Sequence, residues 1–82
     1  MCSMDMRAYI EIDLEPGRDV LASASIIRQI EGIKEAHAVS EHCDILAVIE
    51  ARDLKGIYNI VMRKIQVIKG VSDTRILPCI DI

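Results

Sequence analysis

The first clear pattern in the chain is an alternation of polar and hydrophobic residues between Arg7 and Leu14. On a strand, isoleucine and leucine would share one face, while tyrosine and acidic side chains would share the other, so the pattern predicts a half-buried strand. Glu15-Pro16-Gly17 predicts a turn, because proline presets φ and glycine tolerates positive φ. From about Asp19 to Ile30 the hydrophobic period lengthens to three or four residues, which predicts an amphipathic helix that ends before Gly32.

Two more strands are predicted from Ile33 to Ser40 and from Asp44 to Ala51. Only Glu41-His42-Cys43 separates them, and so short a connection indicates a hairpin. The five residues 45–49 of the third strand are hydrophobic without a break, which is typical of a strand that is buried on both faces.

A second amphipathic helix is predicted after Asp53, which is a good N-cap residue, and a left-handed glycine, Gly70, would close it. The last strand is predicted from Val71 to Ile80. Pro78 within it indicates either a strand at the edge of the sheet or a position near a frayed strand end, because proline has no amide donor. The helix has an apolar stripe and a polar face; the stripe comprises Leu54, Ile57, Tyr58, Val61, Ile65 and Ile68, and the polar face comprises Lys55, Asn59, Arg63 and Gln66.

The predicted order is β, α, β, β, α, β, in a single domain over residues 1–82. Two βαβ units of the usual hand give an α+β, ferredoxin-like βαββαβ sandwich, with a four-stranded antiparallel sheet and both helices on one face. No element is left to cover the other face, to which the third strand contributes hydrophobic residues. An exposed surface of that kind favours association, and a sheet-to-sheet homodimer is its simplest closed form.

Composition supports a self-associating domain and disfavours several other classes. Hydrophobic residues make up 51% of the 82 residues, with no Trp or Phe, so the core must be aliphatic. A domain of this size has a poor surface-to-volume ratio, and its high hydrophobic fraction therefore favours association with a partner. The net charge is −3 and the ten Lys and Arg residues are scattered, which argues against direct binding of nucleic acid or of an anionic membrane. Three unpaired cysteines and the lack of a signal-like or membrane-spanning segment predict a cytoplasmic protein.

The reactive side chains indicate binding more than catalysis. His37, His42, Cys43 and Cys79 do not match a zinc-ligand spacing, so we expect no metal and no cofactor. No nucleophile–base motif or phosphate loop is present, and we do not expect an enzyme. The hairpin from Ser40 to Asp44 could instead bind a free amino acid, with turn amides for its carboxylate and Asp44 for its ammonium group. An ordinary polar hairpin remains the alternative.

Four stretches, in the same order and spacing, resemble the effector-binding C-terminal (RAM) domain of the Lrp/AsnC family of transcriptional regulators. They are Ala8-Tyr9-Ile10 before Glu15-Pro16-Gly17, then Ile30 to Ala36, Asp44 to Leu54, and Ile68 to Thr74. The resemblance implies a ferredoxin-like fold, dimers formed through the sheets, rings of four dimers, and an amino acid effector bound between dimers. The implied ligand-binding residues are Ser40, Glu41, His42, Cys43, Asp44 and Thr74.

The chain departs from the family pattern at two positions. Glu41 stands where the family hairpin usually has glycine, and its carboxylate would repel that of an amino acid unless a cation intervenes. Ile76 replaces a threonine-like residue, whereas Thr74 keeps the first such position. With six residues before the first strand, we expect a stand-alone domain without the helix-turn-helix of full-length relatives.

Three functions therefore stay open at this point. The first is an amino-acid-sensing module that takes part in transcription regulation. The second is an assembly-only module with a degenerate pocket, which hetero-oligomerises with full-length regulators. The third is an enzyme of the dimeric α/β-barrel type, which would need a polar cavity near His37 or Tyr9.

Overall fold

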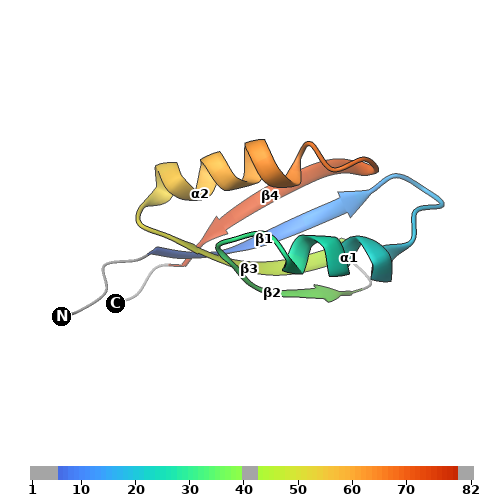
Figure 1. Cartoon of the computed structure of the whole chain (residues 1–82), viewed down its shortest axis with the longest axis horizontal. Helices are drawn as coiled ribbons and strands as arrows, with labels where there is room; N and C mark the ends of the chain where they lie inside the picture. The colour runs from blue at the N-terminus through green and yellow to red at the C-terminus, as the bar shows by residue number, and fades with distance from the viewer. Residues whose placement is uncertain (1–5, 40–42, 80–82) are drawn as a thin grey trace.

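The computed structural model describes residues 6–39 and 43–79, and it confirms the predicted α+β, ferredoxin-like fold. Four strands form one sheet, and two helices lie against it (Figure 1). The elements are β1 (Met6–Leu14), α1 (Val20–Arg28), β2 (Ile33–Ala38), β3 (Ile45–Ala51), α2 (Leu54–Ile60), a π-helical turn η1 (Val61–Ile65) that continues α2, and β4 (Val71–Pro78).

The sheet has the order β2-β3-β1-β4, and every neighbouring pair is antiparallel. The alternating strand β1 is therefore central, while β4 is at an edge, as Pro78 predicted. The amide of Cys79 donates to the carbonyl of Arg7 at 2.9 Å. Because successive amides in a strand point to opposite sides, the nitrogen of Pro78 faces away from β1, and its missing donor costs the sheet no ladder bond.

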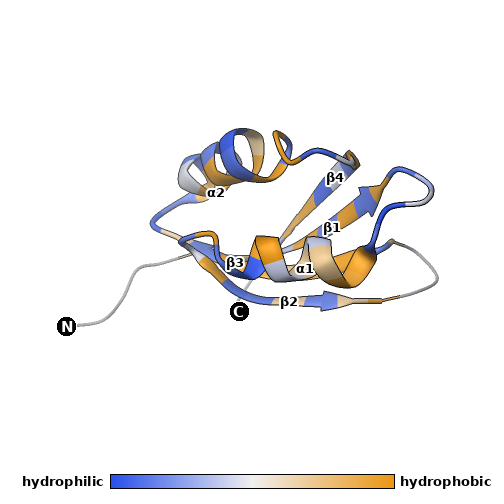
Figure 2. Cartoon of the chain, turned by 45° about the vertical axis from the view of Figure 1, so that its right-hand side comes forward, coloured by the Kyte–Doolittle hydropathy of each residue, from blue (hydrophilic) through white to orange (hydrophobic). Residues whose placement is uncertain are grey.

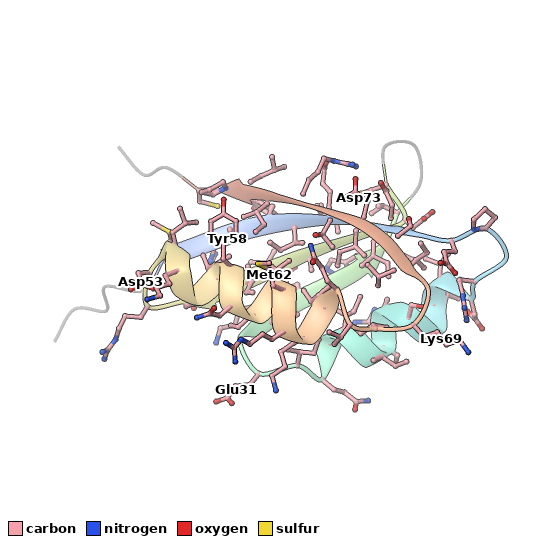
Figure 3. All side chains as sticks on the ribbon, turned by 90° about the horizontal axis from the view of Figure 1, so that it is seen from above. Glu31, Asp53, Tyr58, Met62, Lys69 and Asp73 are labelled. Atoms are coloured by element: carbon pink, nitrogen blue, oxygen red, sulfur yellow. The ribbon has the colours of Figure 1, made fainter. Side chains whose placement is uncertain are left out.

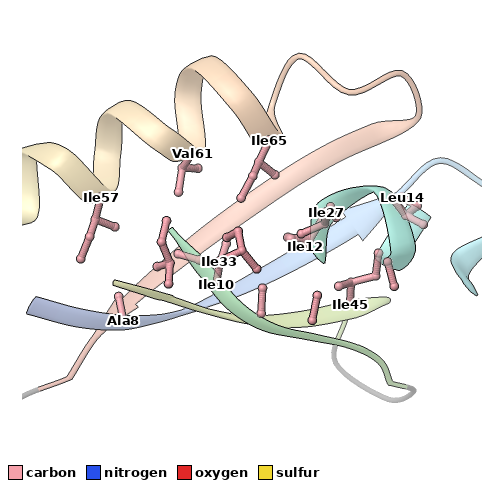
Figure 4. Packing of buried hydrophobic residues seen from close by; sticks show 14 residues of the cluster. Ala8, Ile10, Ile12, Leu14, Ile27, Ile33, Ile45, Ile57, Val61 and Ile65 are labelled. Atoms are coloured by element: carbon pink, nitrogen blue, oxygen red, sulfur yellow. The ribbon is translucent and has the colours of Figure 1, made fainter. Parts of the chain in front are cut away.

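The core is a single aliphatic layer between the sheet and both helices (Figure 4). Alternate residues of β1, beginning with Ala8, are buried on this face, as the sequence pattern predicted. The helices contribute Ala24 and Ile27 from α1, and Ile57, Val61 and Ile65 from α2 and η1. One hydrophobic layer thus holds all six main elements together.

Side chains cap both helices at their N-termini. The carboxylate of Asp19 accepts from the amide of Ala22 at 3.1 Å, and that of Asp53 accepts from the amide of Gly56 at 2.8 Å. These bonds satisfy amides that have no partner within the helix.

Two details of the helices differ from the sequence prediction. Helix α1 ends at Arg28 and not near Ile30, because the amide of Ile30 bonds back three residues to Ile27 (3.0 Å) and tightens the last turn. Tyr58 was predicted in the apolar stripe of the second helix, but its side chain is 46% exposed. It lies on the side of the helix toward β4 (Figure 3).

The sheet face away from the helices, which we call the outer face, is mixed in character. The strands show hydrophobic and hydrophilic bands in Figure 2 because their residues alternate between the two faces. Of the uninterrupted hydrophobic run in β3, Val48 is buried and Leu46 is half-buried. Tyr9 and Leu77, which pair with each other, are 43% and 47% exposed. The outer face therefore has a hydrophobic middle that is only partly covered.

No helix in the described parts of the chain is long and apolar enough to cross a membrane.

Two glycines with positive φ provide a matched test of the packing between the α1–β2 turn and α2. A Cβ on Gly32 (φ 98°) would lie 2.9 Å from Cδ1 of Ile60 and 3.3 Å from the carbonyl oxygen of Glu50, whereas a Cβ on Gly17 (φ 87°) would meet nothing within 4 Å. We expect Gly17→Ala to lower the free energy of unfolding by about 1 kcal/mol through backbone strain alone. Gly32→Ala should lower it by about 2 kcal/mol, because steric overlap is added. Urea denaturation measures both, and equal losses would contradict this account.

Candidate effector site

Asp44 joins the start of β3 to the end of β1. The ladder between these strands ends with the pair Ile12 and Ile45, which leaves the amide of Leu14 beyond it. The Oδ2 atom of Asp44 accepts from that amide at 2.7 Å, and the amide of Asp44 donates to the carbonyl of Ile12 at 3.0 Å. The carbonyl of Asp44 also accepts from the amide of Val39 at 3.0 Å, which closes the β2–β3 hairpin.

Asp44 therefore has a structural role that the sequence analysis did not identify. Its hydrogen bonds hold the base of the hairpin against β1. An ionised carboxylate has about four acceptor positions on its two oxygens, so one bond to a backbone amide leaves room for a ligand's ammonium group. Asp44 is half-buried, and both roles are compatible with its position.

Cys43, the residue before it, is half-buried and donates to the carbonyl of Ile45 at 3.5 Å. Burial raises the pKa of the Cys43 thiol, and the nearby charge of Glu11 raises it further. The thiol therefore stays protonated at neutral pH and is not an activated nucleophile. The other predicted hairpin residues, Ser40, Glu41 and His42, lie outside the described residues, and their roles stay predictions.

Thr74, the remaining predicted ligand residue, lies on β4 and is separated from the hairpin by β1. Both Ile45 of β3 and Thr74 pair with Ile12, one on each side of it. The hydroxyl of Thr74 accepts from Nε2 of Gln66 at 2.8 Å. The amide of Gln66 in turn donates to the carbonyl of Val61 at 2.8 Å. This bond spans five residues, as in a π-helical turn, so the π-helical turn determines the position of Gln66 at the end of the helix.

A small cavity of about 220 Å³ lies beside Thr74, between α2 and β4. Tyr58 and Met62 line it and project from the helix toward β4 (Figure 3). Its described lining residues come from α2, η1 and β4, together with Gln66, and include none of the described hairpin residues. The described residues thus place Asp44 and Thr74 in different surroundings.

A larger cleft, of about 640 Å³, opens between the α1–β2 turn and α2. Gly32, Glu50, Ile60 and Lys64 are among its lining residues, and they come from three separate segments of the chain, the α1–β2 turn, β3 and the helix formed by α2 and η1. No local motif joins these segments, so the pattern of residues along the chain does not predict the cleft. It lies at the far end of β3 from Asp44.

The described side chains that were considered for a metal centre or for the enzyme alternative do not gather at one place. Within residues 6–39 and 43–79, no three His, Cys, Asp or Glu side chains gather closely enough to hold a metal ion. His37 pairs with Glu35 at 3.0 Å, and both side chains are largely exposed. Neither His37 nor Tyr9 lines either of the two cavities above.

Ion pairs occupy the two ends of the outer face. At one end Nε of Arg7 donates to Oε2 of Glu50 at 2.9 Å, and Nζ of Lys34 lies 3.9 Å from Oε1 of Glu50. The hydrogen bond from Arg7 lowers the pKa of Glu50. At the other end Arg75 contacts three carboxylates, those of Glu11 (2.9 Å), Asp13 (3.2 Å) and Asp73 (3.3 Å), and the bond to Glu11 contributes most to raising the pKa of Arg75.

Comparison with known proteins found one matching family, which is described as the Lrp/AsnC ligand binding domain and which matches residues 7–82. No curated protein matched the chain.

Several solved structures share the fold. AsnC of Escherichia coli superposes with a TM-score of 0.86 at 20% identity, over 96% of this chain and 53% of AsnC. A protein of Thermus thermophilus gives 0.85 at 22% identity, over 94% and 95% of the two chains. A transcriptional regulator of Neisseria meningitidis, solved as a complex with L-Met, gives 0.83 at 16% identity, over 96% and 52%. The chain thus spans about half the length of two of these proteins.

The structural role of Asp44 is open to direct test. Asp44→Asn keeps the shape of the side chain but replaces a charge-assisted bond to the amide of Leu14 with a neutral one. We expect the free energy of unfolding to fall by about 1 kcal/mol, measured by urea denaturation at neutral pH. Asp44→Ala should cost more, because it leaves that amide without this acceptor. If both variants unfold like the wild type, the carboxylate does not hold the hairpin base.

The Arg7–Glu50 pair predicts a shift that can be measured at one carboxyl group. Because the hydrogen bond from Arg7 is the main cause of the lowered pKa of Glu50, Arg7→Gln should raise that pKa toward its ordinary value of about 4.3. In the wild type the pair contributes stability above that ordinary pKa and loses it as the pH falls through the lowered pKa. Carbon-detected NMR titration of the Glu50 carboxyl measures the shift. Arg18→Gln is the control, since Arg18 pairs with Glu15.

Proposed function

Because the chain belongs to the Lrp/AsnC ligand-binding domain family, we propose that it is an effector-binding and oligomerisation module that takes part in transcription regulation, with an amino acid as its effector. The match over residues 7–82 carries this proposal. The L-Met complex of the Neisseria regulator supports an amino acid as the class of ligand. The regulators among the similar structures, and the raised pKa of the Cys43 thiol, favour binding over catalysis.

The proposed effector site is the hairpin end of the sheet, with Asp44 as the acceptor for the ammonium group. Backbone amides of the hairpin would donate to the ligand's carboxylate, as the residue types of Ser40 to Asp44 suggest. The bond from Leu14 to Oδ2 of Asp44 supports this assignment, because it fixes the carboxylate in one orientation before a ligand arrives. A fixed acceptor loses less conformational entropy on binding than a mobile one.

The proposed assembly is a homodimer formed through the outer faces of two sheets, which then associates into a higher oligomer. Tyr9 and Leu77 support this proposal, since both are large, apolar and about half exposed in the middle of that face. Burying them would remove apolar surface from water, which is the main favourable term in most protein association.

Calorimetric titration with the twenty amino acids, beginning with L-Met, tests the effector. Asp44→Asn should weaken binding of a responding amino acid by about 10-fold to 100-fold, which is the usual loss for one charge-assisted hydrogen bond. Glu41→Gly should strengthen binding, because it removes a carboxylate that would repel the carboxylate of the amino acid. Glu41 stands three residues before Asp44 in the sequence. Asp53→Asn is the matched control, because Asp53 follows the opposite end of β3 and caps α2.

The result also separates the two regulatory alternatives. No heat with any of the twenty amino acids, in either the wild type or Glu41→Gly, would contradict the effector proposal. Co-purification with a full-length regulator from the same cell, without added ligand, would then favour the assembly-only module. Circular dichroism of each variant before titration checks whether the hairpin substitutions leave the fold intact.

A further inference from the structure

The ten Lys and Arg side chains divide into two equal groups by what surrounds them in the fold. In one group, four members contact carboxylates and one donates to the carbonyl of Ala36. In the other group, no member forms an ion pair or a side-chain hydrogen bond with a residue that the structure describes. The paired cations are Arg7, Arg18, Arg28, Lys34 and Arg75, and the unpaired cations are Arg52, Lys55, Arg63, Lys64 and Lys69.

The unpaired cations all lie between Arg52 and Lys69, a stretch that we call the basic segment. It comprises α2, η1 and the residues on either side of them, and Asp53 is its one acidic residue. Five cations and one carboxylate give the segment four net positive charges. The whole chain has a net charge of −3, so the remainder carries −7, the difference between −3 and +4. Cations that are scattered along the chain are therefore concentrated on one element of the fold.

The exposed side of this helix carries a row of polar side chains. Lys55, Asn59 and Arg63 follow one another at four-residue steps along α2 and η1, and all three are exposed. Residues at that spacing share one face of a helix, and a rise of about 1.5 Å per residue places the two cations about 12 Å apart. The row thus offers two unpaired positive charges with an amide side chain between them.

Two carboxylates beside the basic segment are already engaged. Asp53 accepts from the amide of Gly56 and caps α2. Glu50 lines the cleft that Lys64 also lines, and it is paired with Arg7 on the outer face. Glu31 lines the same cleft, so Lys64 has an acidic neighbour that the row of Lys55 and Arg63 does not have.

The composition of the row fits a phosphate backbone better than a protein surface. Protein interfaces draw most of their binding energy from buried aromatic and apolar anchors, with charges at the rim. The exposed apolar side chains of this helix, Tyr58 and Met62, line the cavity toward β4 and stand outside the row. Nucleic-acid binding instead draws on cations that meet phosphates, and Lys, Arg and Asn side chains all donate to phosphate oxygens.

We propose that the basic segment binds the phosphate backbone of duplex DNA, with Lys55 and Arg63 as the principal contacts. The choice of DNA as the polyanion rests on the regulatory function proposed above. Binding is independent of base sequence, because the row contacts phosphates and not base edges. The negative charge elsewhere on the chain does not prevent it, since charges are screened beyond about 8 Å at physiological ionic strength.

Fluorescence anisotropy with a labelled DNA duplex of random sequence tests this inference. We expect binding that weakens as salt rises from about 50 to 200 mM, because each phosphate contact releases counterions. The double variant Lys55→Gln, Arg63→Gln should raise the dissociation constant at least about tenfold at the lower salt concentration. It should also reduce the slope of log affinity against log salt by about 2, which is one for each lost contact.

The matched control is the double variant Arg7→Gln, Arg18→Gln. It removes the same net charge from cations that are already paired with carboxylates, so it should keep the salt slope of the wild type. Glutamine has nearly the helix propensity of lysine and arginine, so the substitutions at exposed positions of α2 and η1 should leave the helix intact.

Two results would overturn the inference: no binding of the duplex at about 50 mM salt, or a wild-type salt slope in Lys55→Gln, Arg63→Gln. Polyglutamate serves as the second probe, and binding of polyglutamate without binding of DNA would overturn it in favour of an acidic protein partner. Calorimetry with amino acids separates the inference from the proposed function, because neither Lys55 nor Arg63 belongs to the proposed effector site. If amino acids bind and DNA does not, the effector proposal stands and this inference fails.

Discussion

The rest of this structure depends on one aliphatic layer between the sheet and its two helices. The layer contains no aromatic side chain, and its largest fully buried members are isoleucines and one valine. β-branched side chains suit a pleated surface, and their stiffness at χ1 limits how they can pack. Because both helices pack on this one face, no described helix covers the outer face of the sheet.

The central strand β1 links the core to the outer face. Its even-numbered residues from Ala8 to Leu14 are buried, while Arg7, Glu11 and Asp13 take part in ion pairs on the other face. A slip of one residue would reverse these two sets and bury the charges. The register that builds the core therefore also sets which charged side chains the outer face presents.

Asp44 shows how a binding residue can also be part of the scaffold. Its carboxylate ties the hairpin base to Leu14, so the orientation of the proposed acceptor is set by the sheet and not by the ligand. The cost of this arrangement is that binding and stability cannot be separated cleanly at this residue. In contrast, Thr74 is held by Gln66 beside another cavity, on the other side of β1. In a single protomer the two predicted ligand residues do not meet.

The sequence by itself determined the order of elements, the helix caps at Asp53 and the edge position of Pro78. These features follow from local period, capping chemistry and the missing amide of proline, which act within a few residues. Only the tertiary structure decided the exposure of Tyr58, the bond between Leu14 and Asp44, and the cleft beside Gly32. Each of these depends on segments far apart in the chain, and a linear pattern does not record which residues from distant strands become neighbours. The ion pair of Arg75 with Glu11 belongs to the same class, because it exists only once the register of β1 and β4 brings the two residues together.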